Sequence, residues 1–482
     1  MKKTIEYPAE IRTAQDDNRS YHISEFTSKL DHSLQLPLFL VKSNAILEVR
    51  DCQIRSIKEK NLSISESKLP SEIQDICFLV QGSSDSSKRH AALRLKSCTL
   101  TNFHTFIRSD SFNSLHVQKS YFSVCRGHAI ALADPRSVTI SDCVFDRASK
   151  SAINMKFSRE IYEGLTRRIK IGDNQILNSE GYAISLFSEN LNYHDLAILI
   201  FKNIIMNSQK EAVALKFLNI SELQIYQNEI QSTSRNGIYI HNVINSMSNQ
   251  QCIIQENKIT KSGIGGIVIK DSSCLLESNE ISENTQYGVY FSSSDTVTPE
   301  EEQFYQKNPV KLFVNKCRIA KNAGTGINVS GMLKGPIILS SSAVNENLNG
   351  IIINEIENPN KRASMMEETK KSEGTKTAQK DVGRRVESIL FEKSEISRNS
   401  ANGILVHRLC NDLFINQSVI VGNQLNAIWI VNASETHLLK LMDAQSGKLK
   451  EHVQGNIGGP WGKLSEEKLK MEDSKNSNCV IF

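Results

Sequence analysis

Cationic and aromatic side chains recur at two alternating positions of short apolar segments along the chain. Such a row suits binding, because cations beside aromatic rings attract acidic protein segments or anionic sugars. We therefore predict an elongated binding surface that presents Lys156, Phe187, Lys216, Tyr239, His241, Lys270, Tyr290, Leu405, His407 and Trp429. The alternative interpretation is an ordinary solvated strand surface.

The same outward positions hold no Asp or Glu. Glycoside hydrolysis usually requires two carboxylates beside the scissile bond, and calcium sites require acidic oxygen ligands. We therefore predict no catalytic residue, no metal site and no cofactor, and leave open whether loops supply carboxylates.

A sequence repeat predicts the elements that position this surface. An apolar anchor is followed seven residues later by Gly or Ala, as in Ile230 and Gly237. A β-branched residue then comes one place on, and a second apolar residue three places on, as in Ile238 and Ile240. The eleven anchors are Phe122, Phe145, Ile176, Ile205, Ile230, Ile259, Ile281, Ile319, Ala343, Ile396 and Ile420.

Apolar residues at period two are typical of strands that bury one face. Two short strands in each repeat of about 25 residues predict an all-β fold, a single-stranded right-handed parallel β-helix solenoid. Two residues before each anchor, a mostly polar ladder is expected to stack at a turn and satisfy its backbone groups. The ladder comprises Ser120, Cys143, Asn174, Asn203, Asn228, Asn257, Asn279, Cys317, Ser341, Ser394 and Ser418.

This pattern resembles the parallel β-helix repeat family, with its pectin-lyase-like fold. That family includes pectin-degrading enzymes, carbohydrate-binding and sugar-hydrolase modules, and β-helix domains of F-box adaptors. Arg168-Ile169-Lys170 matches an R-I-K triplet of pectin hydrolases, and Gly127-His128 matches part of their G-H-G. Because the accompanying aspartates are missing, we interpret both fragments as coincidence.

The repeat also predicts the domain organisation. Residues 1–40 form an N-terminal extension or cap, and residues 41–432 form the β-helix, interrupted by a disordered charged insertion at about 355–387. A capping helix is expected at 433–454, because an open end of a solenoid exposes unpaired backbone groups. Residues 455–482 are expected to form a flexible tail.

Composition restricts the environment and the partners. Lys plus Arg number 57 against 53 Asp plus Glu, a formal charge of +4, which argues against nucleic acid as a partner. The N-terminus lacks the apolar segment of a secretion signal, and the ten cysteines include no C-x-x-C pair, so we expect reduced thiols in the cytoplasm. Cys479-Val480-Ile481-Phe482 fits a C-a-a-X motif, so Cys479 is predicted to carry a prenyl group and give partial membrane association.

Together these features favour a non-enzymatic scaffold that binds protein partners through acidic segments, with an oligomeric state that the sequence does not indicate. The first alternative is a carbohydrate-active β-helix enzyme or sugar-binding module. The second is a ubiquitin-ligase substrate adaptor, suggested by Leu69-Pro70-Ser71-Glu72-Ile73, which resembles the start of an F-box.

Overall fold

The fold is described by a computed structural model. The described residues are 20–24, 27–30, 38–41, 45–56, 76–81, 91–109, 113–158, 166–188, 195–244, 252–293, 310–331, 335–353, 386–406, 410–425, 428–430 and 480–481. Within these ranges the chain forms strands and turns but no helix. It divides into two compact units, residues 1–266 and 267–482.

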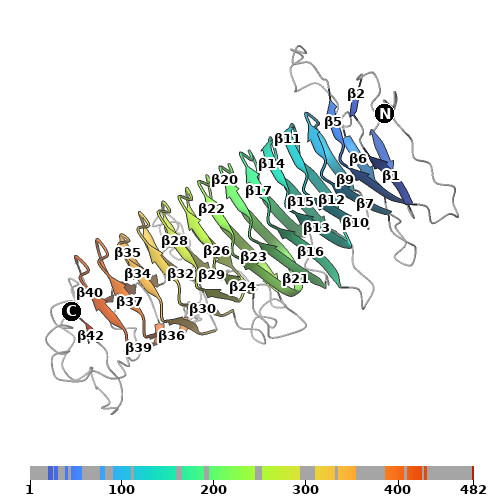
Figure 1. Ribbon diagram of the computed structural model, residues 1–482. Helices are drawn as coiled ribbons and strands as arrows, with labels where there is room; N and C mark the ends of the chain where they lie inside the picture. Colours follow the sequence, from blue (N-terminus) through green and yellow to red (C-terminus); the bar gives the residue numbers. More distant parts are fainter. Residues whose placement is uncertain are drawn as a thin grey trace, which may run out of the picture. The chain divides into compact units, whose positions relative to one another are not determined.

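Unit 1 is built from coils of three short strands that stack in parallel on the coils before and after (Figure 1, blue to green). Sheet A contains β1 (Ser20–Ser24), β4 (Ile46–Arg50), β7 (Ala91–Lys96), β10 (Asn113–Gln118), β13 (Ser137–Ser141), β16 (Arg167–Gly172), β19 (Leu196–Phe201), the second half of β21 (Val213–Tyr226) and β24 (Cys252–Gln255). Sheet B contains β2 (Thr27–Leu30), β5 (Gln53–Ser56), β8 (Thr99–Thr101), β11 (Tyr121–Cys125), β14 (Val144–Ala148), β17 (Gln175–Leu177), β20 (Ile204–Met206), β22 (Glu229–Gln231) and β25 (Lys258–Thr260). Sheet C contains β3 (Phe39–Val41), β6 (Ile76–Val80), β9 (Thr105–Ser109), β12 (Ile130–Ala133), β15 (Ile153–Phe157), β18 (Ile184–Ser188), the first half of β21 and β23 (Ile238–Ile244).

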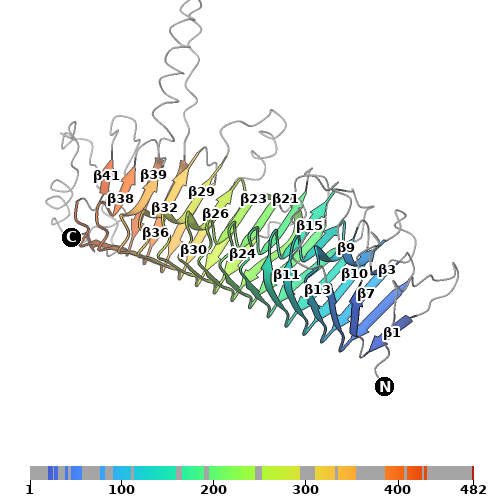
Figure 2. The same ribbon diagram turned by 90° about the horizontal axis from the view of Figure 1, so that it is seen from above.

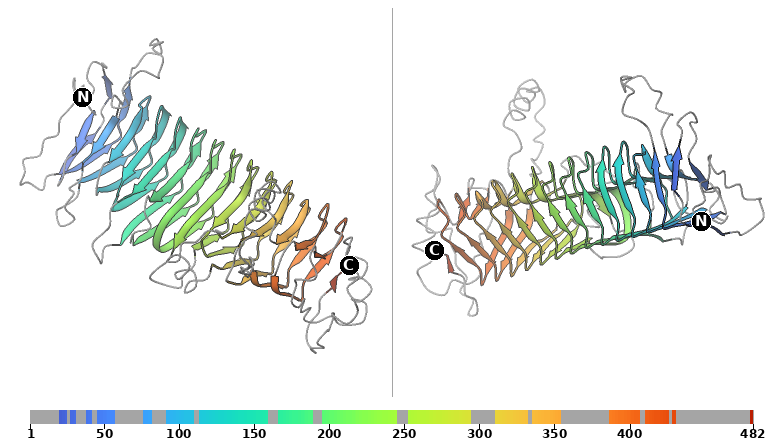
Figure 3. Two further views of the ribbon diagram at one scale, coloured as in Figure 1. Left: turned by 180° about the vertical axis from the view of Figure 1, so that it is seen from behind. Right: turned by 45° about the horizontal axis from the view of Figure 1, so that its top comes forward.

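The register confirms the predicted solenoid and corrects its strand count. Ile153, Ile184 and Val213 occupy one position on successive sheet C strands, and each is fully buried. The apolar row therefore fills the interior, as period-two burial requires. We expected two strands per repeat, whereas each coil has three, because the segment before each anchor adds a sheet A strand. The turned views in Figure 2 and Figure 3 follow the same strands from above and behind.

The turn from sheet A to sheet B is only two residues long. Its first residue has a positive φ, for example 50° at Lys202 and 56° at Gln227, and its second is a ladder residue. Asn228 is 1% exposed; its side-chain amide donates to the Ile200 carbonyl (3.0 Å) and to the Asn257 side-chain oxygen (2.9 Å). Stacked asparagines thus satisfy buried turn groups of successive coils, as predicted.

Unit 2 repeats this three-strand coil (Figure 1, yellow to red), and β26 (Gly265–Lys270) spans the boundary between the units. The sheet A strands are β27 (Cys274–Glu277), β30 (Leu312–Asn315), β33 (Ile337–Ser340), β36 (Val386–Glu392) and β39 (Cys410–Asn416). The sheet B strands are β28 (Glu280–Ser282), β31 (Arg318–Ala320), β34 (Ala343–Asn345), β37 (Glu395–Ser397), β40 (Val419–Val421) and β42 (Val480–Ile481). The sheet C strands are β29 (Tyr287–Ser292), β32 (Thr325–Ser330), β35 (Asn349–Ile353), β38 (Ile404–Val406) and β41 (Ile428–Ile430).

One coil of unit 2 departs from the predicted register by one residue. Val344, not Ala343, is buried and pairs with the anchor Ile396. Ser342, not Ser341, then occupies the polar ladder, and its hydroxyl donates to the Ser340 carbonyl at 2.9 Å. The following turn is one residue shorter than in other coils, so Gly350 comes six residues after the true anchor, Val344. Counted from Ala343 the spacing is the expected seven, which is why the seven-residue rule selects Ala343.

A second asparagine ladder in unit 2 was not predicted. It lies three residues after the anchors, where Asn322 donates to the Asn347 side-chain oxygen (2.9 Å) and Asn347 donates to that of Asn399 (3.3 Å). All three side chains are buried.

Several predictions fall on other parts of the chain. Strands extend upstream of residue 41, since β1 and β2 pair in parallel with β4 and β5. The capping helix at 433–454, most of the insertion and Cys479 lie outside the described residues, so these stay predictions, as do the cytoplasmic location and the protein partners. The flexible tail at 455–482 also stays a prediction, although its residues Val480–Ile481 form β42 and pair with β40. No helix in the described residues is long and apolar enough to cross a membrane.

Candidate functional site

Unit 1 contains a cavity of about 550 Å³ beside the outer surface of sheet C. This volume falls within the range of small-ligand pockets, roughly 300–1,000 Å³. The residues that line it are His128, Ser149, Lys150, Ser151, Asn154, Glu180, Gly181, Tyr182, Ser185, Phe187, Ser188, Lys210, Lys216 and Phe217.

Two kinds of element supply these residues. Strands β15, β18 and β21 contribute Asn154, Ser185, Phe187, Ser188, Lys216 and Phe217. The turns just before β12, β15, β18 and β21 contribute the rest of the wall. The turns stack tightly, because the Gly181 amide donates to the Lys150 carbonyl at 3.1 Å. A Cβ on Gly181 would lie 2.7 Å from the Lys150 backbone, so only glycine permits this approach.

Lysines and tyrosines form a compact cluster at the cavity. The Lys216 ammonium donates to the Tyr182 hydroxyl (3.4 Å) and lies 5.4 Å from the centre of that ring. It also lies 5.0 Å from the centre of the Tyr239 ring, and the Lys210 ammonium lies 5.0 Å from that of Tyr182. Cation–π attraction therefore holds two ammonium groups against the face of one tyrosine.

The cavity carries excess positive charge. Lys150, Lys210 and Lys216 form no ion pair with a carboxylate in the described part of the chain. Glu180 is the single acidic side chain among the lining residues, and it is exposed. An anionic ligand would gain three unneutralised cations, which favours binding of a carboxylate or sulfate group.

His128 contributes a neutral imidazole to this cationic wall. Burial, and then the nearby Lys150 ammonium, lowers the pKa of His128 to about 4. The Ser151 backbone N–H donates to His128 Nδ1 at 3.2 Å. At neutral pH this ring is therefore uncharged, and its Nδ1 is occupied.

Phe217 adopts a backbone conformation that large side chains avoid. Its φ is +54°, whereas Asp134 and Asn242 occupy the corresponding corner of other coils with φ of 48° and 53°. Asp and Asn tolerate this left-handed region better than Phe. The Phe217 ring lines the cavity, and its centre lies 4.8 Å from that of the His241 ring. The unfavourable backbone conformation of Phe217 therefore places an aromatic ring at the cavity.

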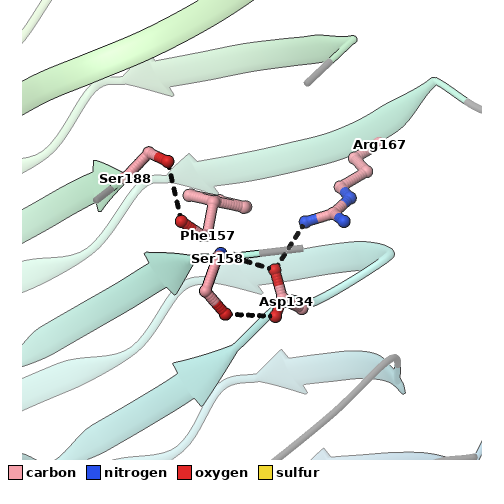
Figure 4. Close-up of polar contacts among 5 residues, drawn as sticks. All are labelled: Asp134, Phe157, Ser158, Arg167 and Ser188. Carbon is pink, nitrogen blue, oxygen red and sulfur yellow. Dashed lines mark hydrogen bonds and ion pairs between the residues drawn. The ribbon is translucent and has the colours of Figure 1, made fainter. Parts of the chain in front are cut away.

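A buried polar network supports the end of the same strands (Figure 4). Asp134 Oδ1 accepts from Arg167 Nη1 (3.2 Å) and from the Ser158 N–H (2.9 Å), and Oδ2 accepts from the Ser158 hydroxyl (2.8 Å). The Arg167 guanidinium also lies 5.6 Å from the centre of the Phe157 ring. Ser188, which lines the cavity, donates its hydroxyl to the Phe157 carbonyl at 2.8 Å and so connects the network to the cavity.

The structure brings the unit 1 residues of the predicted surface together. Lys156, Phe187, Lys216 and His241 occupy one register position on successive strands of sheet C. Tyr239 lies beside this row, with its ring 6.0 Å from that of His241. Phe187 and Lys216 line the cavity itself.

The predicted residues of unit 2 have a different environment. Tyr290 and Leu405 are only 8% and 7% exposed, although we expected them on an open outer face. The Tyr290 ring packs beside Tyr287 (5.2 Å between centres) and carries the Lys270 ammonium at 5.7 Å. His407 and the Trp429 side chain lie outside the described residues.

Sequence reasoning missed the turn residues of the cavity. The missed residues lie one or two places before the small residue of each repeat, whereas our prediction used only the places after it; they are His128, Lys150, Tyr182 and Lys210. Reading those two places down the repeat would have found the basic and aromatic cluster. His128 belongs to the Gly127-His128 fragment interpreted as coincidence, while Arg168-Ile169-Lys170 lies in β16 and does not line the cavity.

No three His, Cys, Asp or Glu side chains of the described ranges lie close enough together to share a metal ion.

Comparison with known proteins identifies the fold. A family model described as a right-handed β-helix region matches residues 83–245 and 242–440. The A-module of mannuronan C-5 epimerase AlgE4 from Azotobacter vinelandii is 11% identical, with a TM-score of 0.40, over 82% of this chain and 91% of that one. A variant of the periplasmic alginate epimerase AlgG is 12% identical, with a TM-score of 0.39, over 80% of this chain and 81% of that one. No curated protein sequence is significantly similar.

These comparisons correct our leading functional expectation. At such identities the likeness shows the fold alone, yet the similar solved structures are alginate and mannuronan epimerases, not interaction scaffolds. The prediction of a non-enzymatic protein-binding scaffold is therefore wrong. That prediction considered only the carboxylate-poor strands, whereas the preceding turns add further polar groups to the cavity, Glu180 among them.

Proposed function

Since the chain belongs to the right-handed β-helix family, we propose that it is a carbohydrate-active protein whose unit 1 cavity binds an acidic sugar. One observation carries this proposal: the Lys210 and Lys216 ammonium groups lie against the Tyr182 ring in a cavity of sugar size that Lys150 also lines. None of the three lysines has a carboxylate partner in the described ranges. Aromatic faces stack on sugar rings, and unneutralised ammonium groups attract their carboxylates.

The polar groups of the cavity favour proton transfer over hydrolysis. Hydrolysis of a glycosidic bond usually requires two carboxylates, and Glu180 is the single acidic residue among those that line the cavity. Lysines that neutralise a sugar carboxylate make the adjacent C–H group more acidic. The Glu180 carboxylate can then accept that proton, and the Tyr182 hydroxyl can return one to the opposite face.

Binding is tested with alginate, polygalacturonate and neutral dextran oligosaccharides by isothermal titration calorimetry. We expect the acidic oligosaccharides to bind and dextran not to bind. Lys210→Glu should weaken binding at least tenfold, which is about 1.4 kcal/mol. Lys170→Glu is the matched control, because Lys170 is exposed on β16 away from the cavity. Equal losses for both variants would mean that the cavity is not the binding site.

The reaction is tested by incubating the protein with the same acidic oligosaccharides in D₂O. Proton abstraction beside the carboxylate should introduce deuterium at that carbon, detected by NMR and mass spectrometry. Glu180→Gln should abolish exchange while leaving binding intact. Hydrolysed products without deuterium would contradict the proposed chemistry.

A further inference from the structure

His128 has one ring nitrogen committed to the backbone of the next coil. The Ser151 backbone N–H donates to His128 Nδ1 at 3.2 Å. A ring nitrogen that accepts a hydrogen bond in this way cannot itself carry a proton. Nδ1 must therefore be the acceptor, and in the neutral ring the proton resides on Nε2. Ser151 is buried, with 3% exposure, so water does not compete readily for this bond.

The surroundings of His128 oppose a second proton on the ring. The charged or titratable groups acting on it are Lys150, His104 and Lys210, and each disfavours the imidazolium. Glu180 also lines the cavity, but it is exposed and does not number among the groups that shift the His128 pKa. Three lysines already supply positive charge to the cavity, and the His128 ring is uncharged at neutral pH. Its contribution to binding must therefore come from a neutral imidazole.

We propose that His128 acts as a neutral hydrogen-bond donor to the bound sugar, through Nε2–H, while Ser151 holds Nδ1. This inference rests on the proposed function of the cavity and assigns one of its residues a definite protonation state and polarity. His128 forms part of the cavity wall, so Nε2–H is the polar group of the ring that remains for a ligand there. Such a donor stabilises a sugar oxygen, including one that gains negative charge during proton transfer.

The consequence is that His128 is not the base of the reaction. A base at this position would require an unprotonated Nε2, and the Ser151 N–H at Nδ1 excludes that neutral tautomer. The contribution of His128 to the binding of an acidic oligosaccharide should then not change with pH between about pH 7 and pH 5, because the ring is neutral throughout.

The test combines spectroscopy of the free protein with binding by two variants. With ¹⁵N-histidine labelling, long-range ¹H–¹⁵N spectra at pH 6 should show His128 as the neutral Nε2–H tautomer, its signals identified by their loss in His128→Gln. His128→Asn keeps an acceptor for the Ser151 N–H but removes the distal donor, and it should bind alginate oligosaccharides about tenfold more weakly. His128→Gln keeps a donor near the Nε2 position and should bind nearly as the wild type does.

The outcomes separate this inference from the proposed function. An Nδ1–H tautomer or a charged ring at pH 6 overturns the inference whether or not a sugar binds. Wild-type binding that His128→Asn leaves unchanged, with circular dichroism confirming the fold, also overturns it alone. A wild-type protein that binds no acidic oligosaccharide overturns the proposed function, and the donor role with it.

Discussion

Removing the charge of Asp134 should destabilise the protein far more than removing that of Asp146. Both aspartates pair with an arginine, but Asp134 and Arg167 are 2% and 1% exposed, whereas Asp146 and Arg147 are 17% and 63% exposed. Asp134→Asn is a mild change sterically, because asparagine also tolerates the φ of 48° and can accept the Ser158 N–H bond. It therefore isolates the loss of charge.

The expected magnitude follows from burial and not from distance. The exposed pair is the closer one, at 3.0 Å against 3.2 Å for the buried pair, so distance alone would rank them the other way. Removing one partner of a buried pair costs about 3–5 kcal/mol, because the other charge stays desolvated. An exposed pair contributes about 0–1 kcal/mol. Burial lowers the pKa of Arg167 while Asp134 acts in the opposite direction, as expected of a desolvated cation that needs its counter-charge.

The assay is urea unfolding followed by circular dichroism, with amide hydrogen exchange of β15 and β16 as a local measure. The second step is a double-mutant cycle with Arg167→Met, which removes the guanidinium that Asp134→Asn leaves behind. The double variant should be more stable than the sum of the two single losses predicts, with a coupling of about 2 kcal/mol or more.

Three results would refute this reasoning. One is an Asp134→Asn loss no larger than that of Asp146→Asn, and another is strict additivity in the cycle. The third is loss of stability confined to strands remote from β15 and β16. Each would show that the buried carboxylate is not the counter-charge on which Arg167 depends.

Three further predictions concern the ladder, the histidine and the thiols. Asn228→Ala should lower the free energy of unfolding by about 2–4 kcal/mol in urea titrations, because it leaves the Asn203 N–H and a carbonyl group buried without their present partner. Stability should fall as the pH drops from about 6.5 towards 4, because the unfolded chain protonates His128 in this window and the folded protein, with a pKa of about 4, does not; His128→Gln should show a shallower slope in thermal melts across this range. Burial raises the pKa of Cys125 and Cys143 to about 12, so iodoacetamide should label neither thiol at pH 8 until urea unfolds the protein, as peptide mass spectrometry would show.

The solenoid could be predicted because its determinants are local and repeated. The alternation around Ile153 or Ile238 is a property of neighbouring residues, and every coil repeats the test independently. The one error of register was to place Ala343 where Val344 belongs. It arose because the turn is one residue shorter there, so that Gly350 lies seven residues after Ala343. Likewise, three strands were read as two, because sheet A strands carry no small residue to mark them.

The candidate site was only half predictable. Phe187, Lys216 and Tyr239 were found because they alternate with buried residues on the strands. Lys210 and Tyr182 were not, because they lie in turns just before the small residue of each repeat, and the prediction used only the strand positions after it. Their partnership depends on the stacking of coils that lie far apart in sequence, as with Lys216 and Tyr182.

The sequence by itself determined the parallel β-helix, the inward row of aliphatic residues and the asparagine ladder of unit 1. Each of these depends on side-chain type and spacing within one coil, which chain chemistry dictates directly. Only the tertiary structure decided which outward residues are buried, as Tyr290 is, and which turns converge on one cavity. Burial and electrostatic environment are set by neighbours on adjacent coils, and it is these neighbours that keep His128 neutral and leave Lys150 available to an anionic ligand.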